Sequence, residues 1–306
     1  MNELFQDCLS AVIVWVTASL CLIGVASAAP ANAPGAPLVP LANANQGVPI
    51  LLYHRFGPTV ADSMTTTTAV FEAQLNFLHA NGYSVIPLRT VVDWVLGKGP
   101  APPPRSVVIT ADDGHRSVST VMLPLVMRYH IPVTLFIYPS AISNASYAMT
   151  WEELAKLKQT GLFDIQSHTF WHPNFKVEKR RLAPAAYQKL VDSQLRKPIA
   201  ILKARLGVSA DLLAWPFGIY SPELMQDAAQ AGYVAAFTID HRRANRSYNA
   251  MALPRYLLNN SDRGAVFTRI VGGGLTEVRP GALIPAKMTR PGPSAPRQSL
   301  PAKHAL

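Results

Sequence analysis

Short apolar runs alternate along the chain with longer segments in which apolar residues recur at helical spacing. The apolar runs predict buried strands at 48–52, 83–86, 106–110, 133–138, 163–166, 212–215 and 233–239. The segments between them predict helices at 71–78, 91–96, 118–129, 151–159, 185–206 and 222–231. Strands that alternate with helices pair in parallel. The pattern therefore favours an α/β fold, a (β/α) barrel that is complete or incomplete, over an open sheet.

Polar residues follow several of the predicted strands at the point where each strand ends. They are His54, the pair Asp112 and Asp113, His168 with the serine before it, and the turn at 215–218. In (β/α) barrels the catalytic side chains come from the carboxyl ends of several different strands. We therefore expect these four places to converge on one site.

The first residues of the chain form a predicted leader. Residues 8–28 are almost uninterrupted apolar and end in the small-x-small pattern of residues 26–28, typical of a cleaved signal peptide. The run is also long enough to span a bilayer, and Glu3 and Asp7 precede it without any Lys or Arg. A cleaved signal peptide, an uncleaved anchor in contact with the membrane and a buried helix remain open. The first two predict export to the periplasm, the cell surface or the medium.

The chain of 306 residues is long enough for one large α/β domain, and no internal repeat divides it. We expect the leader at 1–28, a linker rich in Pro and Ala at 29–47 and a single folded domain at 48–284. Residues 285–306 are basic and rich in Pro, and are predicted to be a disordered tail. The sequence leaves the oligomeric state open.

The formal net charge is +10, from 28 Lys and Arg against 18 Asp and Glu. The excess lies in runs that are typical of solvated faces and loops, at 176–181, 189–203, 242–246 and the tail. No basic run is interleaved with a stacking platform or a known binding motif, which argues against a nucleic-acid partner. Both cysteines lie in the leader, so the predicted domain forms no disulfide.

Two adjacent carboxylates, Asp112 and Asp113, come directly after a buried strand, and Gly114 permits a sharp turn there. If one carboxylate coordinates a cation, the other can stay ionised and act as a general base. The alternative is an ordinary strand-to-helix turn in which Asp caps the helix.

His168 and His172 stand four residues apart after another buried strand, a spacing that points both imidazoles the same way on a helical turn. With one carboxylate they would supply three protein ligands and leave a position for water, as catalytic divalent-metal sites do. The site is not of the zincin type, because Thr169 follows His168 and no Glu is present to act as base.

The turn at 215–218 combines Pro216 and Gly218, which favour a fixed backbone, with Trp215 and Phe217, whose rings could support a sugar. Core packing is the alternative for these aromatic residues. His54 also has an alternative, a core histidine hydrogen-bonded to backbone.

Taken in order, YH at 53–54, TADDG at 110–114, SHTFWH at 167–172 and WPFG at 215–218 resemble the motifs of the polysaccharide deacetylase family. These enzymes are carbohydrate esterases with a NodB-like domain, a distorted or incomplete (β/α) barrel. The resemblance spans roughly residues 48–258. Together with LPR at 253–255, the opening YH is most similar to bacterial poly-β-1,6-N-acetylglucosamine N-deacetylases of biofilm export systems.

The resemblance implies metal-assisted hydrolysis of N-acetyl groups on an extracytoplasmic polysaccharide, with Zn²⁺ as the ion and Co²⁺ or Ni²⁺ as alternatives. Asp113, His168 and His172 match the metal triad, and Asp112 matches the base that activates the attacking water. A barrel that binds carbohydrate without turnover is one alternative. A deacetylase of peptidoglycan or chitin oligomers is another.

The remaining roles follow from the same resemblance. The backbone N–H of Phe217 matches the oxyanion donor, with Trp215 and Gly218 beside it at the substrate. The family usually has Arg at the position of Ala214, and it has a late Leu-x-x-His motif that this chain lacks. In the subgroup, Arg255 is expected to replace the arginine and His54 to replace the late histidine as general acid.

Overall fold

The structure is a computed structural model that describes residues 47–273. The predicted leader at 1–28, nearly all of the linker at 29–47 and the tail at 285–306 lie outside the described residues, as do the last eleven positions of the predicted domain. Between residues 47 and 273 no helix is long and apolar enough to cross a membrane.

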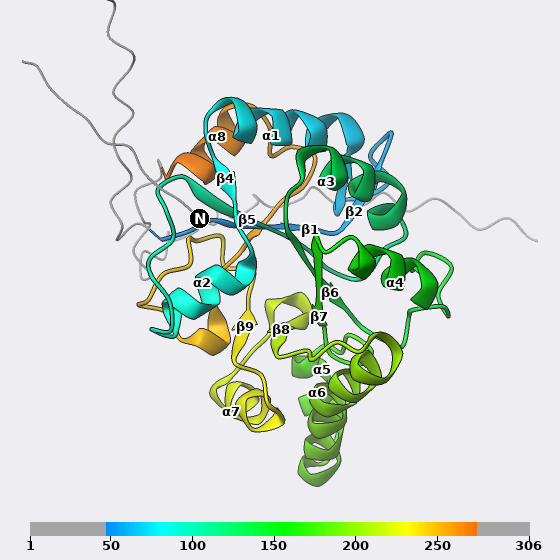
Figure 1. Cartoon of the computed structure of the whole chain (residues 1–306). Coiled ribbons are helices and arrows are strands. Elements are labelled where there is room, and N and C mark those ends of the chain that lie inside the picture. Colours follow the sequence, from blue (N-terminus) through cyan, green and yellow to red (C-terminus); the bar gives the residue numbers. More distant parts are fainter. Residues whose placement is uncertain (1–46, 274–306) are drawn as a thin grey trace, which may run out of the picture. The chain divides into compact units, whose positions relative to one another are not determined.

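One parallel sheet forms the centre of the domain, in the order β10-β1-β5-β6-β7-β8-β9 with β4 beside β5 (Figure 1). Its strands are β1 (Ile50–Tyr53), β4 (Ser84–Val85), β5 (Ser106–Ala111), β6 (Val133–Ile137), β7 (Phe163–Ser167), β8 (Leu212–Ala214), β9 (Ala235–Phe237) and β10 (Tyr256–Leu257). A separate pair, β2 (Arg55–Gly57) and β3 (Thr65–Thr67), follows β1. The parallel pairing confirms the α/β prediction.

Residues 253–258 bridge the two outer edges of the sheet. Leu253 pairs with Phe237 at the end of β9, and three residues later Tyr256 pairs with Leu51 of β1. The sheet therefore curls into a distorted (β/α) barrel, which the short bridging segment closes.

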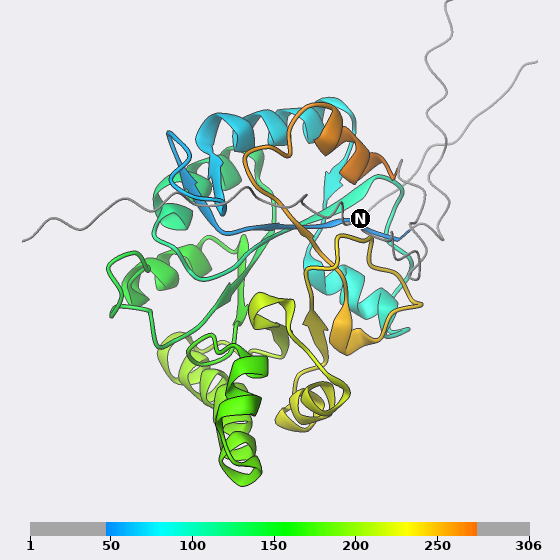
Figure 2. The same ribbon diagram turned by 180° about the vertical axis from the view of Figure 1, so that it is seen from behind.

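Helices surround the sheet on its outer side (Figure 2). They are α1 (Thr68–Ala80), α2 (Leu88–Val95), α3 (Leu123–Tyr129), α4 (Trp151–Gln159), α5 (Phe175–Arg181), α6 (Pro184–Leu206), α7 (Pro222–Ala231) and α8 (Ala265–Gly272). Helices α1 and α8 lie side by side, with the rings of Phe77 and Phe267 5.8 Å apart.

The helix boundaries follow local capping. Thr150 and Glu153 form a capping box before α4, in which each side chain accepts from the other residue's backbone N–H. Ser221 caps α7, which begins at Pro222 and ends at Ala231, and Gly232 after it is in the left-handed conformation. Both helices therefore have the predicted bounds.

Several elements differ from the sequence prediction. The helix predicted at 118–129 begins with a π-helical turn, Val118–Met122, before α3. The strand predicted at 233–239 is ordered as a strand only over Ala235–Phe237. Five elements, β2, β3, β10, α5 and α8, were not predicted, because at two to eight residues they are too short to show a period.

Alternation along the strands divides the core into an inner and an outer part. Val107 and Ile109 of β5 pack outward beneath the helices, while Val108 belongs to a second cluster inside the barrel. Phe136 of β6 and Phe237 of β9 meet within this inner cluster, with ring centroids 5.5 Å apart. Residues of the inner parity at the strand ends thus point into the mouth of the barrel.

Candidate active site

Asp112 follows β5 with the inner parity of Val108 and Thr110, so its carboxylate points into the barrel, where its side chain is only 2% exposed. The backbone then turns through Asp113 (φ 72°) and Gly114 (φ 70°), both in the left-handed region. This turn reverses the chain and brings the Asp113 carboxylate back over the barrel mouth.

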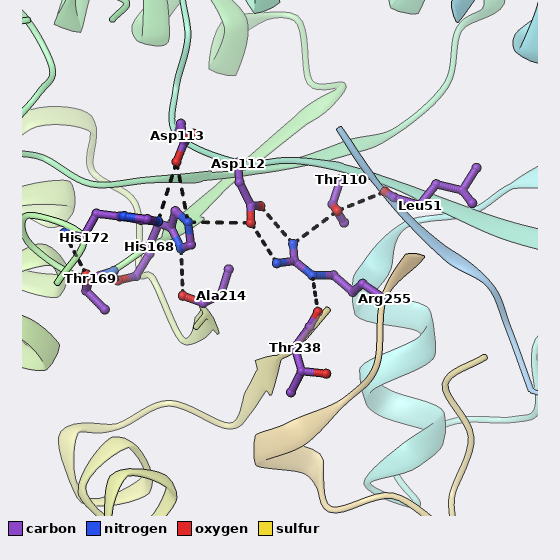
Figure 3. Close-up of polar contacts among 11 residues, drawn as sticks. Leu51, Thr110, Asp112, Asp113, His168, Thr169, His172, Ala214, Thr238 and Arg255 are labelled. Atoms are coloured by element: carbon purple, nitrogen blue, oxygen red, sulfur yellow. Dashed lines mark hydrogen bonds and ion pairs between the residues drawn. The ribbon is translucent and has the colours of Figure 1, made fainter. Parts of the chain in front are cut away.

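Arg255 holds Asp112 from inside the barrel (Figure 3). Its two terminal nitrogens donate to Oδ1 and Oδ2 of Asp112 at 2.8 and 2.7 Å, and its Nε donates to the Thr238 carbonyl at 3.1 Å. The guanidinium is fully buried and lies 5.3 Å from the centroid of the Phe136 ring. Burial raises the pKa of Asp112, whereas Arg255 and His168 together lower it by more than burial raises it. The pKa of Asp112 therefore lies below its usual range. Asp112 is therefore an ionised carboxylate fixed in one orientation.

Asp113, His168 and His172 converge at the barrel mouth (Figure 3). Nε2 of His168 lies 3.7 Å from Oδ1 of Asp113, and Nε2 of His172 lies 3.9 Å from the same oxygen. Two bonds of about 2.0–2.1 Å to one Zn²⁺ ion span up to about 4.2 Å, so an ion can reach Asp113 and either imidazole. The Asp113 and His172 side chains are 19% and 21% exposed, which leaves the triad open to solvent. The residues fit a divalent ion.

The surroundings of His168 favour a metal ligand. Its Nδ1 lies 2.8 Å from the Ala214 carbonyl, which makes Nδ1 the donor and leaves the Nε2 lone pair facing Asp113. Burial lowers the pKa of His168 to about 3, so the imidazole is neutral, the form that binds metal. Burial also lowers the pKa of His172.

The two histidines do not lie on a helical turn, so that part of the sequence prediction is wrong. Residues 168–172 form an irregular loop between β7 and α5, in which Thr169 (φ 65°) and His172 (φ 63°) are left-handed. Positive φ costs about 1–3 kcal/mol at a non-glycine residue and concentrates at functional sites. Together with Asp113 and Phe217, these residues account for four of the eight such positions in 47–273.

Gln194 of α6 stabilises this loop, and the sequence analysis missed it. Its Oε1 accepts hydrogen bonds from the backbone N–H groups of Phe170 and Trp171 at 3.2 and 3.0 Å, and its side chain is 1% exposed. The only sequence signal is a glutamine among the buried positions of a helix, which does not indicate its partner.

His54 follows β1, the strand next to β5, and therefore lies at the same edge as the carboxylates. Its pKa is lowered mainly by burial, while Asp113 and Asp112 act in the opposite direction. Its Nδ1 is buried and has no hydrogen-bond partner within the described residues. The structure places His54 near the triad but in no direct polar contact with it.

The turn at Pro216–Gly218 covers the other side of the triad. Phe217 is left-handed (φ 55°) and 56% exposed, its ring centroid lies 4.5 Å from that of His172, and its N–H has no acceptor within 47–273. A Cβ atom on Gly218 would lie 2.5 Å from a side-chain carbon of Ile239. Trp215 is 1% exposed and donates to the Met251 carbonyl, so it supports the turn from below. This corrects the expectation that Trp215 contacts a sugar.

Comparisons with known proteins agree with this geometry. Residues 99–236 match the family model described as polysaccharide deacetylase. A poly-beta-1,6-N-acetyl-D-glucosamine N-deacetylase of Staphylococcus epidermidis is 24% identical over 201 residues, which cover 64% of this chain and 68% of the relative.

Two solved structures share the fold. The deacetylase PplD of Streptococcus pyogenes has a TM-score of 0.64 at 19% identity, covering 74% of this chain and 98% of its own. IcaB of Ammonifex degensii has a TM-score of 0.63 at 24% identity, covering 71% and 94%. The fold is therefore a NodB-like (β/α) barrel.

Proposed function

We propose that the protein is a divalent-metal hydrolase that removes N-acetyl groups from extracytoplasmic poly-N-acetylglucosamine, because residues 99–236 match the polysaccharide deacetylase model. The observation that carries the proposal is the convergence of Asp113, His168 and His172 beside a carboxylate, Asp112, that Arg255 fixes. The similarity to a relative named for poly-β-1,6-N-acetylglucosamine supports the substrate. The apolar run at 8–28 supports export.

The metal triad would hold Zn²⁺, with Co²⁺ or Ni²⁺ as alternatives for two imidazoles and a carboxylate. When bound, the ion would polarise the acetyl carbonyl and make water a stronger acid. Asp112 lies beside the triad, 3.7 Å from Nε2 of His168, and is ionised, so it can accept the proton of the attacking water.

Three further groups complete the proposed reaction. The N–H of Phe217, which has no acceptor among residues 47–273, stabilises the oxyanion that forms on the acetyl group. Gly218 permits the close approach to Ile239 that fixes this turn. His54 donates a proton to the departing amine. Trp215 supports the turn and does not touch the substrate.

Arg255 also weighs against a barrel that binds carbohydrate without turnover. The absence of an arginine at Ala214 motivated that alternative. A guanidinium on the bridging segment now contacts both oxygens of Asp112, so the base is oriented without it.

The test is acetate release from β-1,6- and β-1,4-linked N-acetylglucosamine oligomers. We expect the β-1,6 oligomer to be preferred, chelation to stop release and added Zn²⁺ to restore it. Release from the β-1,4 oligomer alone would overturn the proposed substrate, and release unaffected by chelation would overturn the metal. Substituting Asp113, His168 or His172 with Ala should abolish metal binding in a titration while the circular dichroism spectrum stays unchanged.

A further inference from the structure

Exposed aromatic side chains gather at one edge of the barrel. Within residues 47–273, four large aromatic side chains are exposed. They are Tyr147, Trp171, Phe217 and Tyr220, with exposed fractions of 43%, 40%, 56% and 37%. All four lie in the loops that follow β6, β7 and β8, at the edge that carries the metal triad. Exposed apolar surface that is concentrated in one place marks a binding site more often than scattered residues do.

Five rings, four from these loops and one from the loop that follows β5, connect into one continuous row. The His115 and Tyr147 rings stack with centroids 6.1 Å apart at 12°, and the Tyr147 hydroxyl hydrogen-bonds to the Tyr138 hydroxyl. The Tyr138 ring lies 5.4 Å from His172, which lies 4.5 Å from Phe217. We call His115, Tyr147, Tyr138, His172 and Phe217 the aromatic strip.

We propose that the aromatic strip binds several consecutive sugar rings of a polysaccharide, so that the chain lies across the metal triad and extends beyond it towards Tyr147. This inference rests on the proposed function for the nature of the sugar. A pyranose ring has an apolar C–H face and a polar rim. Aromatic faces bury the former, and the tyrosine hydroxyls can hydrogen-bond to the latter.

The position of the strip favours a chain over a single sugar. His172, a proposed metal ligand, is one of its inner members, whereas Tyr147 is separated from it by the whole Tyr138 ring. A sugar whose acetyl group reaches the triad cannot also cover Tyr147. Only neighbouring sugars of the same chain can do so, and they would use its 43% exposed surface.

A lipid surface is the competing occupant for exposed aromatic residues. The strip does not fit it well, because its rings pack against one another and alternate with histidines and tyrosine hydroxyls that need polar partners. Rings that insert into lipid would instead project singly and carry no such groups.

The experiment compares Tyr147→Ala and Tyr147→Phe with Met127→Ala, which removes a 50% exposed side chain on α3, away from the strip. Calorimetry on the Zn²⁺-loaded proteins gives the Kd for a β-1,6-linked glucosamine pentamer, the expected product, which is not consumed. We expect Tyr147→Ala to weaken pentamer binding about tenfold, Tyr147→Phe by less than threefold, and Met127→Ala not at all. The KM for the acetylated pentamer should follow the same order.

Equal pentamer affinities in Tyr147→Ala and the unaltered protein would overturn the proposal, as would a loss confined to binding of phosphatidylglycerol vesicles. A loss as large in Tyr147→Phe as in Tyr147→Ala would show that the hydroxyl, not the ring, binds. The proposed function fails separately. If no acetate is released but the pentamer Kd depends on Tyr147, the binding role of the aromatic strip is supported and the proposed function fails. If acetate is released but Tyr147→Ala and the unaltered protein bind the pentamer equally, only the binding role of the strip fails.

Discussion

Replacement of Arg255 by Met should destabilise the domain more than most single substitutions. The guanidinium is fully buried and donates two hydrogen bonds to Asp112, one to the Thr238 carbonyl and one to Thr110. Methionine fits the apolar space between Phe136 and Phe237, so little volume is lost. The damage comes from the buried carboxylate that is left without its cation.

The expected loss is about 3–5 kcal/mol of the free energy of unfolding, the usual cost of removing one partner of a buried ion pair. Asp112→Asn should cost a similar amount, because it leaves the guanidinium unpaired. The double variant Arg255→Met/Asp112→Asn removes both charges, and we expect it to lose no more than about 2 kcal/mol. The two single losses therefore should not add.

Urea denaturation followed by tryptophan fluorescence gives these four free energies, with a chelator present so that metal binding does not contribute. Thr110→Val serves as the control for the loss of a neutral hydrogen-bonding partner of Arg255. The Thr110 hydroxyl donates to the Leu51 carbonyl and accepts from Arg255, but the side chain carries no charge. A loss below about 1 kcal/mol in Arg255→Met, or a double variant whose loss equals the sum of the single losses, would refute the ion-pair reasoning.

Three other predictions concern the supports of the site. Gln194→Leu should weaken Zn²⁺ binding about 10- to 100-fold in a titration, because two N–H groups beside His172 lose their acceptor. Gln188→Leu on the same helix should not change this affinity. Gly218→Ala should lower stability by about 2–4 kcal/mol in urea, more than Gly161→Ala, which has a similar φ but open space. His54→Ala should slow amide hydrolysis strongly and an activated acetyl ester much less. Equal losses on both substrates, together with a lower Tm, would indicate a structural histidine.

Much of the fold could be predicted from the sequence because its strands are buried on both sides. Runs such as 106–110 and 133–138 are mostly apolar and contain no charged residue, so their burial is unambiguous. The inner position of Asp112 also follows from parity, two residues after Thr110. The convergence of Asp113, His168 and His172 followed from the rule that parallel strands end at one edge.

The rest depends on contacts that leave no local pattern. Thr169 and His172 are left-handed in a loop that Gln194 of α6 holds by two hydrogen bonds, whereas residue spacing alone suggested a helical turn. The sequence does not show which aromatic residue of the turn is buried. Trp215 and Phe217 stand two positions apart, and only Trp215 is buried in the structure. Arg255 precedes a strand of two residues, too short for any periodicity, and its partnership with Asp112 was expected only from the family resemblance.

The bridge at 253–258 also leads us to expect an order of events during folding. Asp112 and Arg255 are 143 residues apart in the chain, so we expect their contact, which closes a very long loop, to form late. Until then β1 and β9 are open strand edges, which can pair with other chains and aggregate. Docking of one short segment protects both edges and delivers the counter-ion of the base. We therefore expect a molecule without this bridge to be both prone to aggregation and catalytically inactive. Docking of the bridge would protect the strand edges and complete the active site in the same step.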